Sequence, residues 1–132
     1  MIGLDTNIVV RLFVDDDERQ RAAAARLIDK LPSRDKAVIN PVVLVELLWT
    51  LKSVYGFDRD QLAMVVTKLS EHPKIQLIET DIAREAVHRA REVGGDIPDH
   101  MIALLNRGHG CDVTYTFDRD AAESPDFALL KI

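Results

Sequence analysis

Four carboxylates lie within or next to apolar segments of the sequence, and together they could bind metal. Asp5 directly follows the apolar run that begins the chain, and Asp118 follows the run "DVTYT". Glu46 lies inside the stretch "PVVLVELLWT", and Asp99 follows Pro98 at the start of a helical pattern. An unpaired buried carboxylate is so unfavourable that it becomes protonated, so each acid must be exposed, partnered or functional.

Gathering these acids at one place requires a counter-charge. Two carboxylates about 5 Å apart repel by roughly 3 kcal/mol at an effective dielectric of about 20, and four would cost on the order of 10 kcal/mol. A divalent cation removes this cost, and all-oxygen ligands suit Mg²⁺ or Mn²⁺ better than Zn²⁺. Two such ions about 4 Å apart can activate water and stabilise a phosphodiester leaving group. We therefore expect the four carboxyl groups to lie within about 10 Å of one another.

Short apolar runs alternate with helical patterns along the chain. Strands are expected at residues 1–4, 36–40, 75–78, 112–116 and 128–132. Helices are expected at residues 15–31, 41–54, 58–69, 80–92 and 98–108. No linker or repeat interrupts this order, so residues 1–132 predict one domain. The alternation predicts an α/β fold with a central, mostly parallel sheet of four to five strands and helices on both faces.

The expected fold gives the acids a common edge, because ligands bind at the carboxyl ends of the strands in open parallel sheets. Asp5 and Asp118 would stand at that edge, and Glu46 and Asp99 could lean over it from helices. Three acids also have a structural explanation. Asp5 could cap a helix, Asp118 could be a turn residue, and Asp99 could be favoured by the helix dipole.

Glu46 is the hardest of the four to explain structurally, because Val42, Val43 and Trp49 lie on its side of the expected helix. Trp49 could stack on a nucleobase. A tryptophan in such an apolar run is more often part of the core, and that is the position we expect for it.

The composition sets limits on partners and location. The 22 acids against 17 bases give a net charge of −5, which argues against binding nucleic acid by bulk positive charge. Cys111 is the only cysteine, so no intrachain disulfide can form, which suits a reducing cytosol. The start of the chain has no signal-peptide pattern, and the longest apolar run is well short of the roughly 20 residues that a membrane span needs. We expect a cytoplasmic protein that does not enter the membrane.

Basic residues crowd the first third of the chain. They could form a stripe that contacts phosphates, or a solvated helix face paired with its own acids. The residues are Arg11, Arg19, Arg21, Arg26, Lys30, Arg34 and Lys36.

The motifs resemble the PIN domain, in particular the VapC-type toxins of toxin–antitoxin pairs. The similarity covers essentially the whole chain through "IGLDTNIVVRLF", "NPVVLVELLWTL", "GDIPDHMIALL" and "VTYTFDRDA". The first motif is similar to the family's apolar strand followed by Asp-Thr-Asn, and the second to its helix with an embedded Glu. The third is similar to the family's acid followed three and four residues later by Ile-Ala, and the fourth to its Thr-x-Asp.

The resemblance implies a Mg²⁺-dependent endoribonuclease that cleaves RNA, with Mn²⁺ as an alternative ion. The implied catalytic and metal-binding acids are Asp5, Glu46, Asp99 and Asp118. Three further residues match polar positions of the family that orient the acids or the attacking water. They are Thr6, Asn7 and Thr116. Asp96 is an alternative third acid, ranked below Asp99 because Asp99 has the Ile-Ala spacing. The resemblance also implies a homodimer and a cognate antitoxin protein that wraps the toxin in a higher assembly.

Two other functions compete with this reading. One is a phosphatase that uses Asp5 as nucleophile, but such enzymes place a second Asp where this chain has Asn7. The other is a non-enzymatic module of the same fold that binds RNA or a partner through a degenerate site. The full set of four acids argues against lost activity.

Overall fold

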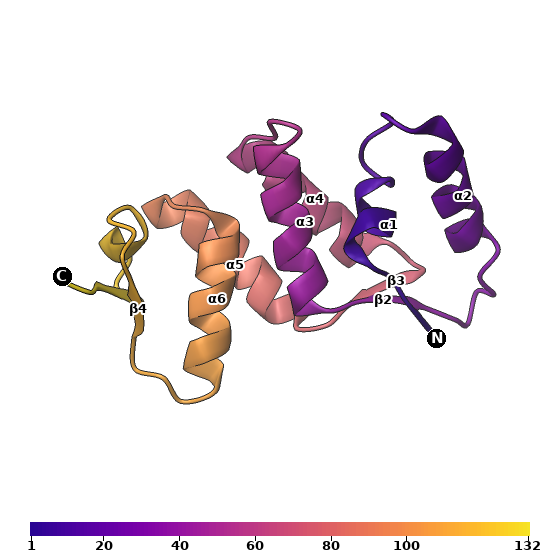
Figure 1. Ribbon diagram of the computed structural model, residues 1–132. Helices are drawn as coiled ribbons and strands as arrows, with labels where there is room; N and C mark the ends of the chain where they lie inside the picture. The colour runs from indigo at the N-terminus through magenta and orange to yellow at the C-terminus, as the bar shows by residue number, and fades with distance from the viewer. The chain divides into compact units, whose positions relative to one another are not determined.

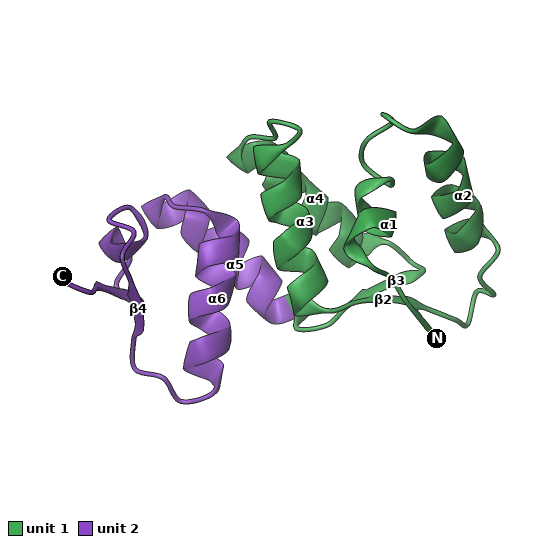
Figure 2. Cartoon of the chain, in the orientation of Figure 1, with its two compact units in different colours: residues 1–80 green, residues 81–132 purple.

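Short parallel strands separated by helices make up the chain, and the computed structural model describes all 132 residues (Figure 1). The chain divides into two compact units, Met1–Thr80 and Asp81–Ile132, here called unit 1 and unit 2 (Figure 2). The α/β class and the parallel strands are confirmed. The expectation that residues 1–132 form one domain stays a prediction.

Unit 1 holds three strands and four helices. They are β1 (Ile2–Gly3), α1 (Thr6–Val10), α2 (Glu18–Asp29), β2 (Ala37–Ile39), α3 (Pro41–Ser53), α4 (Arg59–Glu71) and β3 (Ile75–Leu77). The strands form one parallel sheet in the order β1-β2-β3, and Ala37 of β2 lies in register between Ile2 and Ile75.

Unit 2 begins in the first turn of a helix and contains a separate pair of strands. Its elements are α5 (Thr80–Val93), α6 (Ile97–Gly108), β4 (Thr114–Thr116), the 3-10 helix η1 (Ala121–Glu123) and β5 (Phe127–Leu129). β4 and β5 are parallel, with Thr114 opposite Phe127. We expected one sheet of four to five strands, whereas the ladder hydrogen bonds define a sheet of three and a sheet of two. Most strands have only three residues, so each ladder contains few hydrogen bonds.

Polar side chains set the helix starts. The Asp17 carboxylate accepts from Gln20 N at 3.1 Å, so α2 begins after Asp17 and not at Asp15 as the acidic run suggested. Asn40 Oδ1 accepts from Val43 N at 2.9 Å at the start of α3. Each bond satisfies an amide that has no partner within its helix.

Helix α3 is the centre of the core of unit 1. Its inner face is fully buried and consists of Leu44, Leu47, Leu48 and Leu51. Its opposite face, which we call the outer stripe, is exposed and consists of Val42, Glu46, Trp49 and Ser53. The spacing of four, three and four residues puts these outer residues on one side of a helix. No helix of the chain is long and apolar enough to cross a membrane.

We predict that the two faces of α3 respond differently to truncation. Leu47→Ala should lower the free energy of unfolding by about 2–5 kcal/mol, because it leaves a cavity in a closed core. Val42→Ala, on the outer stripe, should change it by no more than about 0.5 kcal/mol. Urea denaturation followed by circular dichroism measures both, and equal losses would contradict this division of the helix.

Candidate metal centre

Asp5 and Glu46 are linked through one threonine. Asp5 follows β1 and caps α1, where its Oδ1 accepts from Thr6 N at 2.7 Å. The Thr6 hydroxyl donates to Glu46 Oε2 at 2.9 Å. Thr6 therefore holds both carboxylates, one through its amide and the other through its hydroxyl. The structural reading of Asp5 as a helix cap is correct, and the same geometry places it beside the second acid.

Glu46 is not a buried charge. It lies exposed on the outer stripe of α3, while the residues on either side of the stripe point into the core. We expected Val42, Val43 and Trp49 on its side of the helix, but Val43 is buried on the inner side, and Trp49 is exposed where we expected core. The apolar run made Glu46 look enclosed because sequence proximity hides the 100° turn between successive helical residues. Glu46 is therefore open to solvent and accepts a hydrogen bond from the Thr6 hydroxyl.

Asn7 is exposed and faces a different neighbourhood. It lines a hollow of about 450 Å³ between α1 and α2, together with Arg11 and Gln20. Arg11 Nε donates to Gln20 Oε1 at 2.9 Å across this hollow. The contact that joins Asp5 and Glu46 is made by Thr6, and Asn7 adds no hydrogen bond to either acid.

Asp96 and Asp99 share a small hollow at the start of α6. Asp96 is the residue before the helix and Asp99 lies in its first turn, and both are half-buried. Both line a hollow of about 10 Å³ with His100, Asp120 and Ser124. The turn at Gly94 and Gly95, with φ of 77° and 84°, folds the chain back so that Asp96 packs beside Asp99.

Asp118 is positioned by the residues around it. Thr116 Oγ1, at the end of β4, accepts from Asp118 N at 3.0 Å. The Asp118 carboxylate in turn accepts from Asp120 N at 2.9 Å, at the start of η1. Asp118 is exposed and is not among the residues that line the hollow of Asp96 and Asp99. It is therefore a turn residue, as its structural reading held, in a turn that leaves the acid facing solvent.

His100 fastens the turn that carries Asp96 and Asp99. It is only 2% exposed, and its Nε2 lies 2.8 Å from Gly94 O. A carbonyl oxygen only accepts, so Nε2 carries the proton and Nδ1 is left as an acceptor. No group of the protein donates to Nδ1. Gly95 has φ of 84°, which favours glycine, and a Cβ there would also lie only 3.2 Å from Nε2.

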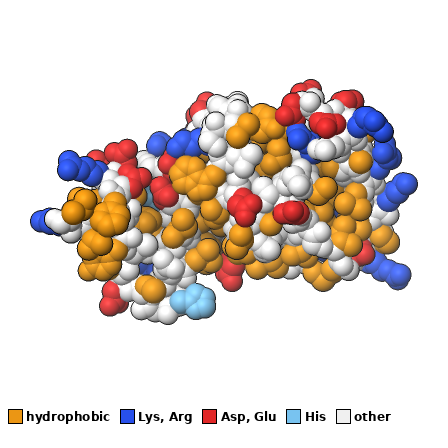
Figure 3. Space-filling model, viewed as in Figure 1, with side chains coloured by type: hydrophobic (Ala, Val, Ile, Leu, Met, Phe, Trp, Pro, Cys, Tyr) orange, Lys and Arg blue, Asp and Glu red, His pale blue; other side chains and the backbone are white.

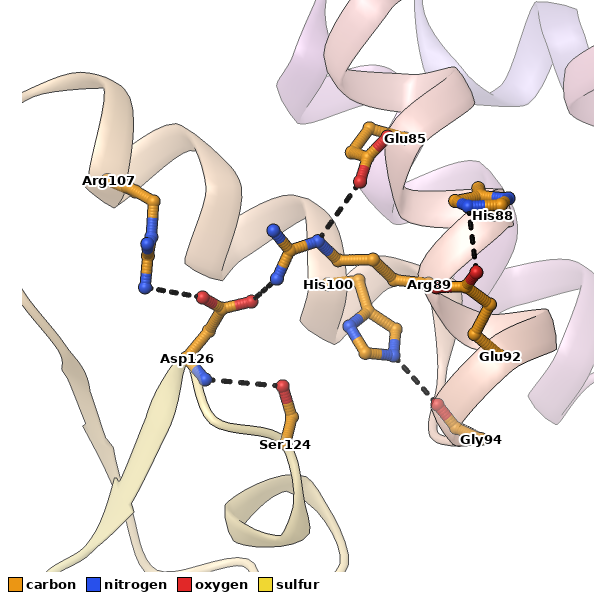
Figure 4. Close-up of polar contacts among 9 residues, drawn as sticks. All are labelled: Glu85, His88, Arg89, Glu92, Gly94, His100, Arg107, Ser124 and Asp126. Atoms are coloured by element: carbon orange, nitrogen blue, oxygen red, sulfur yellow. Dashed lines mark hydrogen bonds and ion pairs between the residues drawn. The ribbon is translucent and has the colours of Figure 1, made fainter.

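A buried carboxylate joins the two helices of unit 2 to its strands (Figure 4). Asp126, 4% exposed, precedes β5 and accepts from Arg89 of α5 and from Arg107 Nη2 of α6, the latter at 2.6 Å. Glu85 supports Arg89 Nε at 3.3 Å. Two guanidinium groups compensate the desolvation of this carboxylate, which is the condition for a stable buried charge. The start of β5 is thus tied to α5 and α6.

Oxygen donors dominate both groups of acids. Carboxylates and a hydroxyl are ligands for hard divalent cations, so the residues present fit Mg²⁺ or Mn²⁺. Within either unit, no three carboxylate, histidine or cysteine side chains gather closely enough to hold a metal ion. Asp5 and Glu46 belong to unit 1, and Asp99 and Asp118 to unit 2. The expectation that all four carboxyl groups lie within about 10 Å stays a prediction.

Of the basic residues of the first third, Arg19, Arg21 and Arg26 lie on α2, and Figure 3 shows basic side chains on the surface of this part of the chain. Several are paired with acids of the same region. Arg11 contacts Asp16, and Arg21 Nη1 lies 3.5 Å from Glu18 Oε2. These pairs favour the reading of a solvated helix face over that of a continuous phosphate-binding stripe.

Comparison with known protein families identifies the fold. The family model of the PIN domain matches residues 2–126, and the chain therefore belongs to the PIN domain family. No curated protein matches it. Proteins with this domain are typically nucleases that use divalent metal ions.

His100 and Asp126 are structural residues that the sequence did not single out for their actual roles. His100 is buried and contacts the carbonyl oxygen of Gly94. A signal was present, because a histidine shortly after a Gly-Gly turn can reach back to the turn. The Asp126 cluster had no usable signal, since Arg89 and Arg107 are separated from it by many residues of other elements.

We predict that His100 can be replaced only by a side chain that reaches the Gly94 carbonyl. His100→Ala should cost about 2–4 kcal/mol of unfolding free energy, because it opens a cavity and leaves a buried carbonyl without its donor. His100→Gln, whose amide N–H₂ reaches a position similar to that of Nε2, should recover about 1 kcal/mol or more. Chemical denaturation measures both, and identical losses would show that the hydrogen bond to Gly94 contributes nothing.

Proposed function

We propose that this protein is a Mg²⁺-dependent endoribonuclease and the toxin of a toxin–antitoxin pair. The observation that carries the proposal is that Thr6 donates to both Asp5 and Glu46 in a chain of the PIN family. A helix cap alone explains Asp5, but nothing structural requires an exposed acid from α3 to meet it.

The proposed ligands are the acids of both units, Asp5, Glu46, Asp99 and Asp118. Thr6 orients the first two, and Thr116 orients Asp118 through the hydrogen bond to its amide. Asn7 is a further polar group near the first acid, and Asp96 is the alternative third acid. Joined in one site, these carboxylates would repel strongly unless a cation lay among them.

A divalent ion held by these acids would lower the pKa of a bound water and stabilise the oxygen that leaves the phosphodiester. The chain's own contribution is to fix the ligands before the substrate arrives. The Thr6 hydroxyl donates to Glu46, the Asp118 amide donates to Thr116 Oγ1, and the Asp118 carboxylate accepts from Asp120 N within its turn. Such fixed ligands reduce the reorganisation needed during reaction.

The proposed partners are an RNA substrate and a cognate antitoxin protein, with a homodimer as the basic assembly. The motifs of the PIN-type toxins support these partners. A phosphatase is disfavoured, because Asn7 cannot act as the second acid of that mechanism and the chain belongs to the PIN family. A binding module without activity remains the second candidate, favoured by the absence of a complete metal cluster within either unit.

We predict that Mg²⁺ or Mn²⁺ raises the melting temperature of the metal-free protein. An ion that binds only the folded state stabilises it by about 2.7 kcal/mol at 100 times its Kd. Asp5→Asn should raise the melting temperature without metal, because it removes a repelling charge, and asparagine also caps helices well. The same variant should reduce the shift that metal produces. If neither the metal nor the substitution raises the melting temperature, the acids are not crowded.

We predict that Asp99, more than Asp96, supports RNA cleavage. Asp99→Asn should lower the rate by a factor of about 100 or more, because it removes a ligand of the catalytic ion. Asp96→Asn should cost only severalfold, since Asp96 precedes the helix and its neighbours can compensate. Cleavage of a labelled RNA by the purified chain measures both rates.

Controls separate metal affinity from chemistry in this assay. Each variant is measured at saturating Mn²⁺ and at low Mg²⁺, and EDTA should abolish the activity of the unmodified chain. A dead Asp96→Asn variant beside a near-normal Asp99→Asn variant would show that the third ligand is Asp96. RNA cleavage that is equally fast in EDTA would contradict a metal-dependent nuclease.

A further inference from the structure

The only tryptophan of the chain lies on the surface beside a proposed metal ligand. Trp49 is 36% exposed, although the inner face of the same helix is fully closed by leucines. It belongs to the outer stripe of α3, three residues after Glu46, and residues at this spacing are neighbours on a helix surface. An apolar side chain of this size in an apolar helix would ordinarily be core, so its outward position calls for an occupant.

A positive charge accompanies the ring. Lys52 Nζ lies 5.3 Å from the centre of the Trp49 ring, which is within the range of a cation–π contact. In a chain with a net charge of −5, this puts a cation and an aromatic surface next to an acid that is proposed to hold metal. The part of the ring that is open to solvent could be contacted by a second planar group. Aromatic surfaces with adjacent cations are the usual platform for single-stranded nucleic acid.

We propose that Trp49 is a stacking platform for an unpaired nucleobase of the substrate, next to the bond that is cleaved. The inference rests on the proposed ribonuclease function and deepens it, because it assigns a residue that positions the substrate. Trp49 and Glu46 are less than one helical turn apart, about 5 Å along the axis, so a base on the ring belongs to a nucleotide near the reacting phosphate. Paired bases inside a duplex do not present their faces to a side chain.

The platform also predicts how sequence affects binding. Every base has a π-face, so stacking tolerates all four bases and selects for an unpaired conformation. Discrimination between targets would then depend on which RNA offers an unpaired base beside the cleaved bond. Trp49 is therefore a binding and positioning residue that does not touch the reacting atoms.

Because the chain has one tryptophan, its intrinsic fluorescence reports directly on Trp49. The full-length chain is titrated with a short single-stranded oligoribonucleotide in EDTA at low salt, so that binding is measured without cleavage. We expect saturable quenching of the fluorescence. The same strand annealed into a blunt duplex should bind at least about tenfold more weakly and leave the fluorescence nearly unchanged.

Three variants test the ring by the anisotropy of a labelled oligoribonucleotide. Trp49→Ala should weaken binding by about five- to a hundredfold, which is the range measured for loss of one base–aromatic stack. Trp49→Phe keeps a stacking ring and should stay within about threefold of the unmodified chain. Met64→Ala is the matched control, because Met64 is 54% exposed on α4 and its loss should leave the affinity unchanged.

Several results would overturn the inference. Single-stranded RNA could bind without quenching the fluorescence, or it could bind no more tightly than the duplex. The Trp49→Ala variant could bind RNA with unchanged affinity. Finally, the quenching could depend on protein concentration alone. The last would show that a second copy of the chain covers the ring. Failure of the proposed function is separate, since it appears as RNA bound in this way without metal-dependent cleavage.

Discussion

A carboxylate at the edge of an apolar core must reach water or a hydrogen-bond donor, and this constraint governs where the acids of this chain lie. Glu46 meets it by standing on the exposed stripe of a helix whose other face is fully buried, with the Thr6 hydroxyl as its donor. The leucines of that face cannot move without exposing the core, so the backbone beneath Glu46 is rigid. A rigid support is what a ligand needs if it is to bind an ion without reorganisation.

Unit 2 meets the same constraint in two ways. Asp126 is buried and is compensated by the guanidinium groups of two helices, so it serves the fold. Asp96 and Asp99 are half-buried at a helix start, where the partial positive charge of the helix end favours acids. His100 holds their turn closed through Gly94. A buried acid paired with two arginines thus supports the framework, whereas Asp96 and Asp99 at the start of α6 are partly exposed.

Much of this arrangement could be predicted from the sequence, and the remainder could not for identifiable reasons. The alternation of short apolar runs with helical patterns is a strong signal of secondary structure, because each run fits few kinds of element. This signal predicted the α/β class and the strands. Asp5 and Asp118 follow strands, so their turns were predictable. The direction in which Trp49 points was not, because an apolar helix with one acid gives little indication of which face is outward. Contacts between distant elements, such as Arg89 with Asp126, leave no local pattern.

The central claim is the proposal that Asp5, Glu46, Asp99 and Asp118 supply the ligands of a divalent ion. The most direct measurement is anomalous diffraction from crystals of the full chain grown with Mn²⁺. The account predicts one ion with a carboxylate ligand from Asp5 or Glu46 and another from Asp99 or Asp118. Each ligand oxygen should lie about 2 Å from the ion, or one of them about 4 Å away if a single water lies between. An ion held by acids of one unit alone, or no ion near Thr6 at saturating Mn²⁺, would contradict it.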